Sequence, residues 1–169
     1  MQNSKSFFEY VLRLGDSCLI LSQRLGEWCG HGPILEEDIA LTNFALDLLG
    51  HARFWLSYAA ELEGAGRDED QLAFLRDTGE FRNLLLVEQE NGDFAETIAR
   101  QFYFDNWYFA VLDSLRSSTD SQIRAIAEKA TVATNNIGHF LQINDVFPLF
   151  GLFDPINQTW HVQPAAYTR

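Results

Sequence analysis

The sequence contains one long stretch without proline, from Ile34 to Phe147, in a chain of 169 residues. Proline breaks a helix interior because it lacks the backbone N–H and its ring clashes with the preceding turn. Within this stretch and before it, apolar residues recur at spacings of three and four, the period of an α-helix with a buried face. The sequence therefore predicts an all-α protein made of successive helices.

The first helix is predicted from about Ser6 to Cys29, where the apolar residues form a single buried stripe. A glycine-rich break follows at residues 30–33 and ends this helix. The stripe consists of Leu14, Cys18, Leu21, Leu25 and Trp28.

A second helix is predicted from Pro33 to about Glu63. Proline suits the first turn of a helix, acidic residues at 36–38 favour the positive end of the helix dipole, and Gly64 supplies the stop. Two apolar stripes run along this helix, which predicts a central position in a bundle. The first is Leu35, Ile39, Leu46, Leu49 and Leu56, and the second is Leu41, Ala45, Leu48, Ala52, Trp55 and Leu62.

The segment 67–91 is mixed in character. Acidic residues at 68–70 can open a short helix through Leu75, since carboxylates stabilise a helix start. Residues 78–79 predict a turn, and the apolar segment 81–87 is assigned as helical.

Two further helices are predicted after this segment. Asp93 followed by Glu96 has nearly the sequence of a capping box and begins a helix that reaches about Arg116. Asp120 or Thr119 then caps the next helix.

The composition changes sharply after residue 130. Residues 130–169 hold only three charged residues but three of the four prolines. We therefore divide the chain into a partial helical bundle at 1–130 and a divergent tail at 131–169. An extended arm, a buried hydrophobic segment and a sequence that is not native to this fold would each explain the tail.

Charge and hydropathy exclude several classes of partner. Twelve Lys and Arg against 24 Asp and Glu give a net charge of −12, which repels phosphate backbones and anionic lipid headgroups. The sequence shows neither a secretion signal nor an uncharged apolar run of about 18 residues. Cys18 and Cys29 would lie about 16 Å apart on one helix, too far for a disulfide. We expect a reduced, cytoplasmic protein that binds neither nucleic acid nor membrane.

Carboxylates within a helical bundle raise the question of a di-iron site. Such a site needs a Glu from each of two helices and Glu-x-x-His from each of two others. His51 has Leu48 three residues earlier, and its nearest acidic neighbour, Asp47, lies four residues earlier. His139 has Asn136 three residues earlier. The second pair of ligands is absent, so we predict that the chain has no metal, no cofactor and no catalytic residue of its own.

A polar stripe that includes Asp47 and His51 remains on the otherwise apolar second helix. One interpretation is that this stripe faces solvent. The alternative places both residues inside the bundle, opposite Asp105, as a degenerate site held by an internal ion network. A buried carboxylate needs a partner, and protonated His51, Arg24 or Arg53 could supply the positive charge.

Aromatic residues make up 14% of the chain, and several gather at 102–109. Aromatic side chains at helical spacing are typical of core positions and of subunit contacts, because each buries a large apolar surface. If part of this excess meets another protein chain, the candidates for a partner interface are Trp28, Tyr103 and Trp107.

Several long strings give the chain a specific resemblance to one family. They are Arg13 to His31 (RLGDSCLILSQRLGEWCGH), Ala45 to Arg53 (ALDLLGHAR), Leu56 to Leu62 (LSYAAEL), Asn83 to Gln89 (NLLLVEQ) and Phe94 to Gln101 (FAETIARQ). Over about residues 8–130, the chain resembles the structural subunits of ring-1,2-phenylacetyl-CoA epoxidase, also called the PaaC (PaaI) type of phenylacetate-CoA oxygenase subunit.

The resemblance implies a ferritin-like helical bundle that has lost its metal site and pairs with a homologous catalytic subunit. The complex would insert one oxygen atom from O₂ into the aromatic ring of phenylacetyl-CoA in aerobic phenylacetate degradation. Iron would reside in the catalytic subunit, and a reductase subunit would deliver electrons from NADPH, with small accessory subunits beside them. Asp47, His51 and Asp105 carry over only as candidates for the degenerate site.

The resemblance ends in the tail. Family members continue with more bundle helices, and they carry a Glu-x-x-x-His string where this chain has residues 133–137. A shift of reading frame near residue 130 would explain the loss of charge, the gain of proline and the early end, and a genuine variant tail is the alternative. Two other functions remain open, a metal-dependent ferritin-like oxygenase and a stand-alone helical binding protein.

Overall fold

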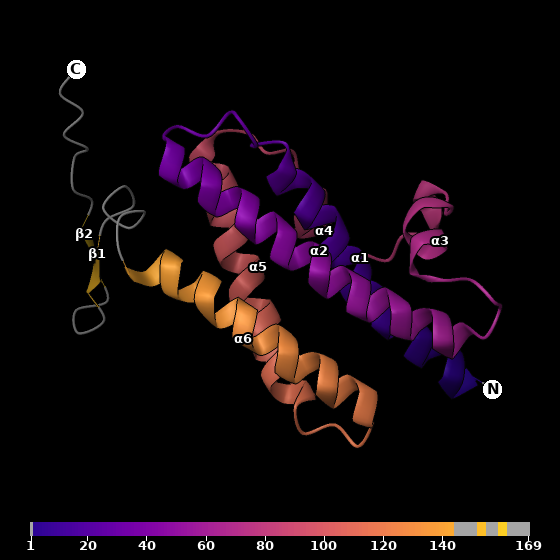
Figure 1. Ribbon diagram of the computed structural model, residues 1–169. Coiled ribbons are helices and arrows are strands. Elements are labelled where there is room, and N and C mark those ends of the chain that lie inside the picture. The colour runs from indigo at the N-terminus through magenta and orange to yellow at the C-terminus, as the bar shows by residue number, and fades with distance from the viewer. Residues whose placement is uncertain (1, 144–151, 155–158, 162–169) are drawn as a thin grey trace.

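The computed structural model describes the backbone of residues 2–143, 152–154 and 159–161, and the side chains of residues 5–132. Four long helices dominate this part of the chain, as two hairpins formed by α1 with α2 and by α5 with α6 (Figure 1). The predicted all-α class is confirmed, and the arrangement is a ferritin-like bundle. The helices are α1 (Gln2–Gly26), α2 (Leu35–Glu63), α3 (Glu69–Phe74), the 3₁₀ helix η1 (Thr78–Glu80), α4 (Leu85–Glu88), α5 (Phe94–Leu115) and α6 (Ser121–Ile143), followed by the antiparallel strands β1 (Leu152–Asp154) and β2 (Thr159–His161).

Helices α1 and α2 approach closely at Gly15. A Cβ atom at this position would lie 2.9 Å from Leu56 Cδ2 and 3.2 Å from the Cβ atom of Trp55, so a larger residue would push the helices apart. Further along, the Ser22 hydroxyl donates a hydrogen bond of 2.8 Å to the Ala45 carbonyl. The predicted α1 stripe is confirmed for its four buried members, Leu14, Cys18, Leu21 and Leu25.

Both ends of α1 differ from the prediction. The helix begins at Gln2, before the predicted start at Ser6, and it ends at Gly26 instead of Cys29. Residues 27–31 form turns, in which the backbone N–H of Cys29 donates to the carbonyl three residues earlier at 3.1 Å. The helix therefore ends four residues before the predicted glycine-rich break at residues 30–33.

The start of α2 also differs from the prediction. Ile34 is its extended N-cap, with φ −141° and ψ 162°, so Pro33 precedes the helix instead of occupying its first turn. The predicted stop is confirmed. Gly64 adopts the left-handed conformation with φ 64°, and its N–H donates to the Ala60 carbonyl.

The predicted caps of α5 and α6 are confirmed. Asp93 accepts a hydrogen bond of 2.8 Å from the Glu96 N–H, and the Glu96 side chain bonds back to the Asp93 N–H, which is a complete capping box. Asp120 caps α6 by accepting from the Ile123 N–H at 3.0 Å. Its other carboxylate oxygen accepts a hydrogen bond of 2.6 Å from the Tyr58 hydroxyl, which joins the start of α6 to α2.

The connection between α2 and α5 is held against α1 by a buried ion pair. Arg76 binds both carboxylate oxygens of Asp16, and both side chains are almost fully shielded from solvent. The same guanidinium lies 4.2 Å from the ring centre of Phe81. This ion pair anchors the middle of the connection 64–93.

The assignment of residues 81–87 as helical is wrong for most of that segment, because only Leu85–Glu88 forms helix α4. The preceding N–H groups bond to side chains of α1 instead of to helical carbonyls. Arg82 donates to Asp16 at 2.8 Å, and Leu84 donates to the Ser17 hydroxyl at 3.1 Å. These distant acceptors hold the backbone extended until α4 begins.

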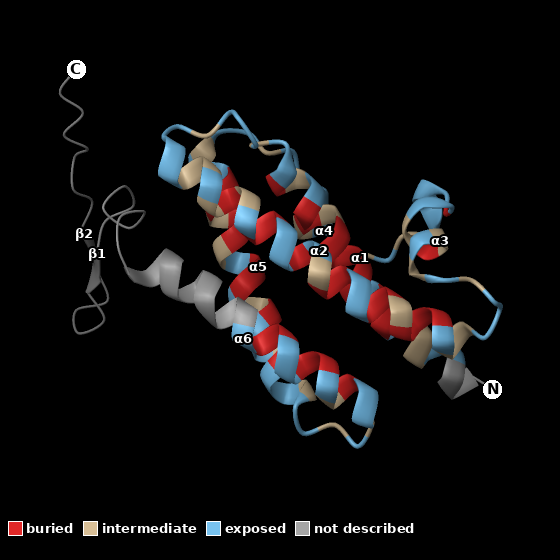
Figure 2. Cartoon of the chain, viewed as in Figure 1, coloured by how far each residue is buried: buried red, intermediate tan, exposed pale blue. Residues whose placement is uncertain are grey.

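Only one of the two predicted stripes of α2 is buried. Its members from Leu41 to Trp55 face α1 and the bundle interior, with Leu62 half-buried. From the other stripe, Leu56 alone is buried, and the remaining four leucine and isoleucine side chains are exposed. Figure 2 shows exposed segments recurring along the full length of α2. The predicted central position of α2 is therefore correct for one face only.

The division at residue 130 stays a prediction. Most of the predicted tail, with His139, Asn136 and His161, has side chains outside the described residues, and α6 itself continues to Ile143. None of the helices in the described part of the chain combines the length and apolarity that crossing a bilayer requires.

Replacing Asp16 by alanine should lower the free energy of unfolding by about 3–5 kcal/mol, because Arg76 would stay buried without its carboxylate. Urea denaturation followed by circular dichroism measures the loss. Asp113→Ala is the matched control, since it removes an exposed ion pair with Arg116 and should cost less than about 0.5 kcal/mol. Equal losses in the two variants would contradict the anchoring role of Asp16.

Candidate functional site

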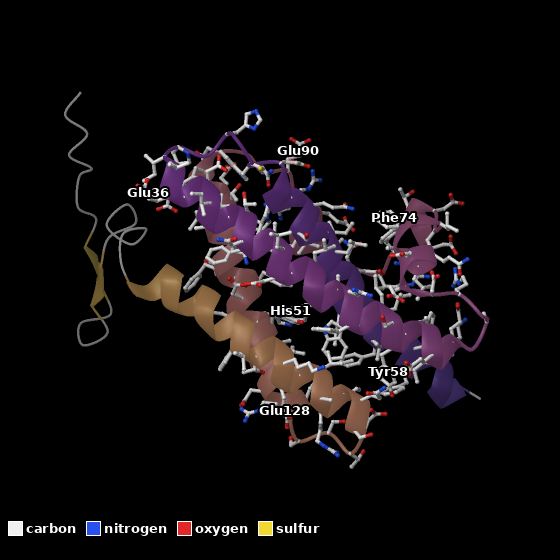
Figure 3. The ribbon with its side chains drawn as sticks, in the orientation of Figure 1. Glu36, His51, Tyr58, Phe74, Glu90 and Glu128 are labelled. Carbon is white, nitrogen blue, oxygen red and sulfur yellow. The ribbon has the colours of Figure 1, made fainter. Side chains whose placement is uncertain are left out.

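A polar cluster lies inside the bundle, where α1, α2 and α5 meet. Figure 3 shows His51 on the side of α2 that faces the bundle interior. All members of the cluster are buried, and we call them the central cluster. They are Cys18 from α1, His51 and Trp55 from α2, and Gln101, Asp105 and Tyr108 from α5.

Tyr108 connects three other members of the central cluster, one from α1 and two from α2. Its hydroxyl accepts a hydrogen bond of 2.9 Å from Trp55 Nε1, and it lies beside the Cys18 thiol. Its ring stacks on Phe104, with 5.4 Å between ring centres, and lies 5.7 Å from the His51 ring. Burial raises the pKa of Cys18 to about 12 and raises that of Tyr108 well above its usual value, so both groups are protonated at neutral pH.

Asp105 is the acidic member of the central cluster. Its Oδ1 atom accepts a hydrogen bond of 2.8 Å from Gln101 Nε2, one helical turn earlier. Its Oδ2 atom has no hydrogen-bond partner among the described residues. Burial raises the pKa of Asp105 to about 7, although the bond from Gln101 acts in the opposite direction. This carboxyl group is therefore close to half protonated at neutral pH.

His51 is the basic member of the central cluster, and it is neutral. Burial lowers its pKa to about 4, and its Nδ1 atom has no hydrogen-bond partner among the described residues. A neutral imidazole cannot serve as the counter-charge of Asp105 at neutral pH. The ion pair that protonated His51 was a candidate to form with Asp105 is therefore absent from the described residues, because burial keeps His51 neutral.

The structure does not bring Asp47 and Arg24 into the cluster. Asp47 is exposed on α2, so its predicted burial beside His51 is wrong. Asp47 lies one turn before His51 on the same helix, but its side chain is on the solvent-exposed surface of α2, whereas His51 is buried. Arg24 donates to Glu27 at 3.2 Å and to the Glu88 carbonyl at 3.0 Å, which places it at the α1–α4 contact.

Arg53, the third candidate cation, is also outside the cluster. Its side chain is exposed and forms an ion pair of 3.3 Å with Glu69 on α3. Neither of the arginines proposed for the ion network therefore lies in the interior around Asp105.

The central cluster does not fit a di-iron centre. Such a centre uses four carboxylates and two imidazoles from four helices, whereas the cluster offers Asp105 and His51 only. The other members are a thiol, an amide, a phenol and an indole, of which the indole donates to the phenol and the amide donates to Asp105. Across the described residues, no three His, Cys, Asp or Glu side chains gather in a group that could hold a metal ion.

Four members of the central cluster were not predicted as site residues, namely Cys18, Trp55, Gln101 and Tyr108. A signal for two of them exists on α5. Gln101 and Tyr108 lie four residues before and three residues after Asp105, so all three share one face with the core residue Phe104. The neighbours of a buried acid on its own helix are thus better predicted from helical spacing than from a search for opposite charges.

The three candidate interface aromatics differ in exposure. Tyr103 is 65% exposed on α5. Trp28 is half-buried and donates a hydrogen bond of 3.0 Å from Nε1 to the Thr97 hydroxyl. Trp107 is half-buried against Phe104, with 5.6 Å between ring centres. Two of the three therefore contribute to the fold of this chain itself.

Replacing Asp105 by asparagine should stabilise the protein more at pH 8 than at pH 5. The folded-state pKa of Asp105 is raised to about 7 from 3.8, so its contribution to stability is full below pH 3.8 and is lost as the pH rises to about 7. Asp105→Asn should raise the free energy of unfolding by about 2–3 kcal/mol more at pH 8 than at pH 5. Urea denaturation at both pH values measures this difference, with Asp113→Asn on the exposed side of α5 as the control. A gain that does not depend on pH would contradict a protonated Asp105.

Replacing Asp47 by alanine should change the free energy of unfolding by less than about 0.5 kcal/mol, because an exposed side chain contributes little. Thermal or urea unfolding of the variant against the unmodified chain provides the test. A loss of about 3–5 kcal/mol, the magnitude for a stranded buried partner, would instead return Asp47 to the bundle interior.

Two comparisons with known proteins agree with this architecture. A family model described as phenylacetic acid catabolic protein, PaaA_PaaC, matches residues 1–134. The chain is also 64% identical over 121 residues to one of the subunits of 1,2-phenylacetyl-CoA epoxidase from Escherichia coli (strain K12), a match that covers 72% of this chain and 48% of that protein. The chain thus spans about half the length of the curated relative it matches. On the extent of the family match and this identity, the chain belongs to the PaaA_PaaC family of phenylacetic acid catabolic proteins.

Proposed function

We propose that this chain is a non-catalytic structural subunit of an oxygenase complex that epoxidises the aromatic ring of phenylacetyl-CoA. In this proposal the chain has no cofactor of its own and acts in the cytoplasm. Iron is held by a homologous catalytic subunit, a reductase subunit supplies electrons from NADPH, and small accessory subunits complete the complex. The name of the relative, a subunit of a phenylacetyl-CoA epoxidase, supports the substrate and the assembly.

The observation that carries the structural role is the chemistry of the central cluster. At the place where a ferritin-like bundle holds metal ligands, this chain has one carboxyl group and one imidazole beside a thiol, an amide, a phenol and an indole. His51 is neutral, Asp105 is close to half protonated, and Tyr108 holds its proton. A di-iron site needs four carboxylates and two imidazoles, so this cluster lacks three of the carboxylates and one of the imidazoles.

In the proposed complex, the chain contributes a surface that binds the catalytic subunit. Residues 1–130 would form the bundle that contacts the catalytic subunit, and the candidates for that contact are Trp28, Tyr103 and Trp107. Among these, Tyr103 offers the largest exposed aromatic surface. Aromatic residues are enriched where two protein surfaces are buried together.

The test is to purify the full chain alone and together with the catalytic subunit from the same genome. Alone, the chain should contain no stoichiometric iron. The co-purified complex should contain iron and should consume phenylacetyl-CoA in a reaction that depends on O₂, NADPH and the reductase. Iron is measured by mass spectrometry of the protein solution, and the epoxide by chromatography.

His51→Gln separates the structural role from a catalytic one. If the chain has no metal site, the iron content of the complex should be the same in the variant and in the unmodified complex. Stoichiometric iron in the chain alone, lost in His51→Gln, would favour a metal-dependent oxygenase. Failure to co-purify with the catalytic subunit would favour a stand-alone helical binding protein.

A further inference from the structure

The face of α2 that points away from the core carries a row of exposed apolar side chains. Four of its side chains are between 47% and 71% exposed, although leucine and isoleucine are usually buried. They are spread along the N-terminal half of the helix. They are Leu35, Ile39, Leu46 and Leu49.

The exposed residues follow the repeat of a two-helix contact. Successive spacings of four, three, four, three and four residues connect six positions, which is the pattern of a and d positions in a coiled coil. We call these positions the α2 seam. They are Leu35, Ile39, Thr42, Leu46, Leu49 and Arg53, and they extend over about 27 Å of helix.

The α2 seam is complementary to itself when two copies run antiparallel. With the two-fold axis beside residue 44, Leu35 lies opposite Arg53 of the second copy. In the same register, Ile39 lies opposite Leu49, and Thr42 lies opposite Leu46. Each seam residue therefore meets another seam residue, with a positions opposite d positions as in antiparallel coiled coils. A contact in which residue i meets j and j meets i is the requirement for a symmetric dimer.

Charge at the two ends of the seam favours the same arrangement. Glu36, exposed at the N-terminal end of α2 (Figure 3), would lie beside Arg53 of the second copy. The Arg53 side chain is 74% exposed, and its ion pair with Glu69 engages Nε, so its terminal nitrogens could bind a second acid. Two such pairs, one at each end, would offset part of the repulsion between two chains of net charge −12.

We propose that the α2 seam binds a second copy of this chain, with the two α2 helices antiparallel and the two-fold axis near residue 44. This inference does not rest on the proposed role in an oxygenase, because every contact in it comes from the surface of one chain. The interface is a single helix pair with charged ends, so association is expected to depend on protein concentration in the micromolar range.

Sedimentation velocity of the full chain over a range of concentrations tests the proposal. Leu46→Glu places a carboxylate beside the two-fold axis, and it should shift the protein to a monomer. Leu85→Glu is the matched control, because Leu85 is 78% exposed on α4, outside the seam, and its replacement adds the same charge. Circular dichroism should show the same helical content in both variants.

A charge exchange distinguishes the antiparallel seam from general apolar association. Arg53→Glu alone should weaken the dimer, because two acids would then face each other at each end. The double variant Glu36→Arg with Arg53→Glu should restore it, because each new arginine again faces a glutamate of the second copy. Restoration cannot result from a loss of folding.

Three results would overturn the proposal. The chain could be a monomer at the highest concentration, Leu85→Glu could disperse the dimer as strongly as Leu46→Glu, or the double variant could behave like Arg53→Glu alone. A monomeric chain whose binding to the catalytic subunit is abolished by Leu46→Glu would assign the seam to that subunit instead.

Discussion

Asp16 has no exposed surface, and a carboxylate in that position requires a cation that is equally shielded from water. In this chain, Arg76 supplies that cation from a point 60 residues further along. The connection between α2 and α5 must therefore return to the middle of α1. Once it does, the extended residues before α4 find acceptors on α1, and the start of α5 is placed beside the end of α1. The geometry of the second helical hairpin follows from where this pair forms.

The central cluster also contains a buried carboxyl group, but its charge is reduced in a different way. Among the described residues, no arginine or lysine pairs with Asp105, and burial instead raises its pKa until protonation removes much of the charge. His51 responds in the opposite direction and becomes neutral. One polar site in this bundle is thus held by an ion pair, whereas protonation removes part of the charge from the other. This protonation makes stability depend on pH, whereas the ion pair binds two distant segments together.

Much of the fold could be predicted from local signals in the sequence. The caps at Asp93 and Asp120 involve residues two or three positions apart, and the buried stripe of α1 repeats at fixed spacing. Features that depend on distant residues could not be predicted in the same way. Residues 81–84 are apolar enough for a helix, but their N–H groups find acceptors on α1, and only the assembled bundle reveals those acceptors.

The candidate site shows the same division. The sequence predicts His51 and Asp105 in the bundle interior, and both side chains are buried there. Asp47 was placed in the interior because it shares a turn with His51, yet the boundary between the buried and exposed surfaces of α2 passes between them. Spacing along a helix gives the relative direction of two side chains, but which direction is inward depends on how the neighbouring helices pack.

The two cysteines of this chain differ in exposure and in reactivity. Cys29 is exposed on the turn after α1, whereas Cys18 is buried against Tyr108, and burial raises its pKa to about 12. A thiolate is the reactive form, so an alkylating reagent should modify the folded protein at Cys29 alone. Modification of Cys18 then requires the bundle to open around the central cluster. The rate of that second alkylation provides a built-in measure of how often the interior of this protein is exposed to water.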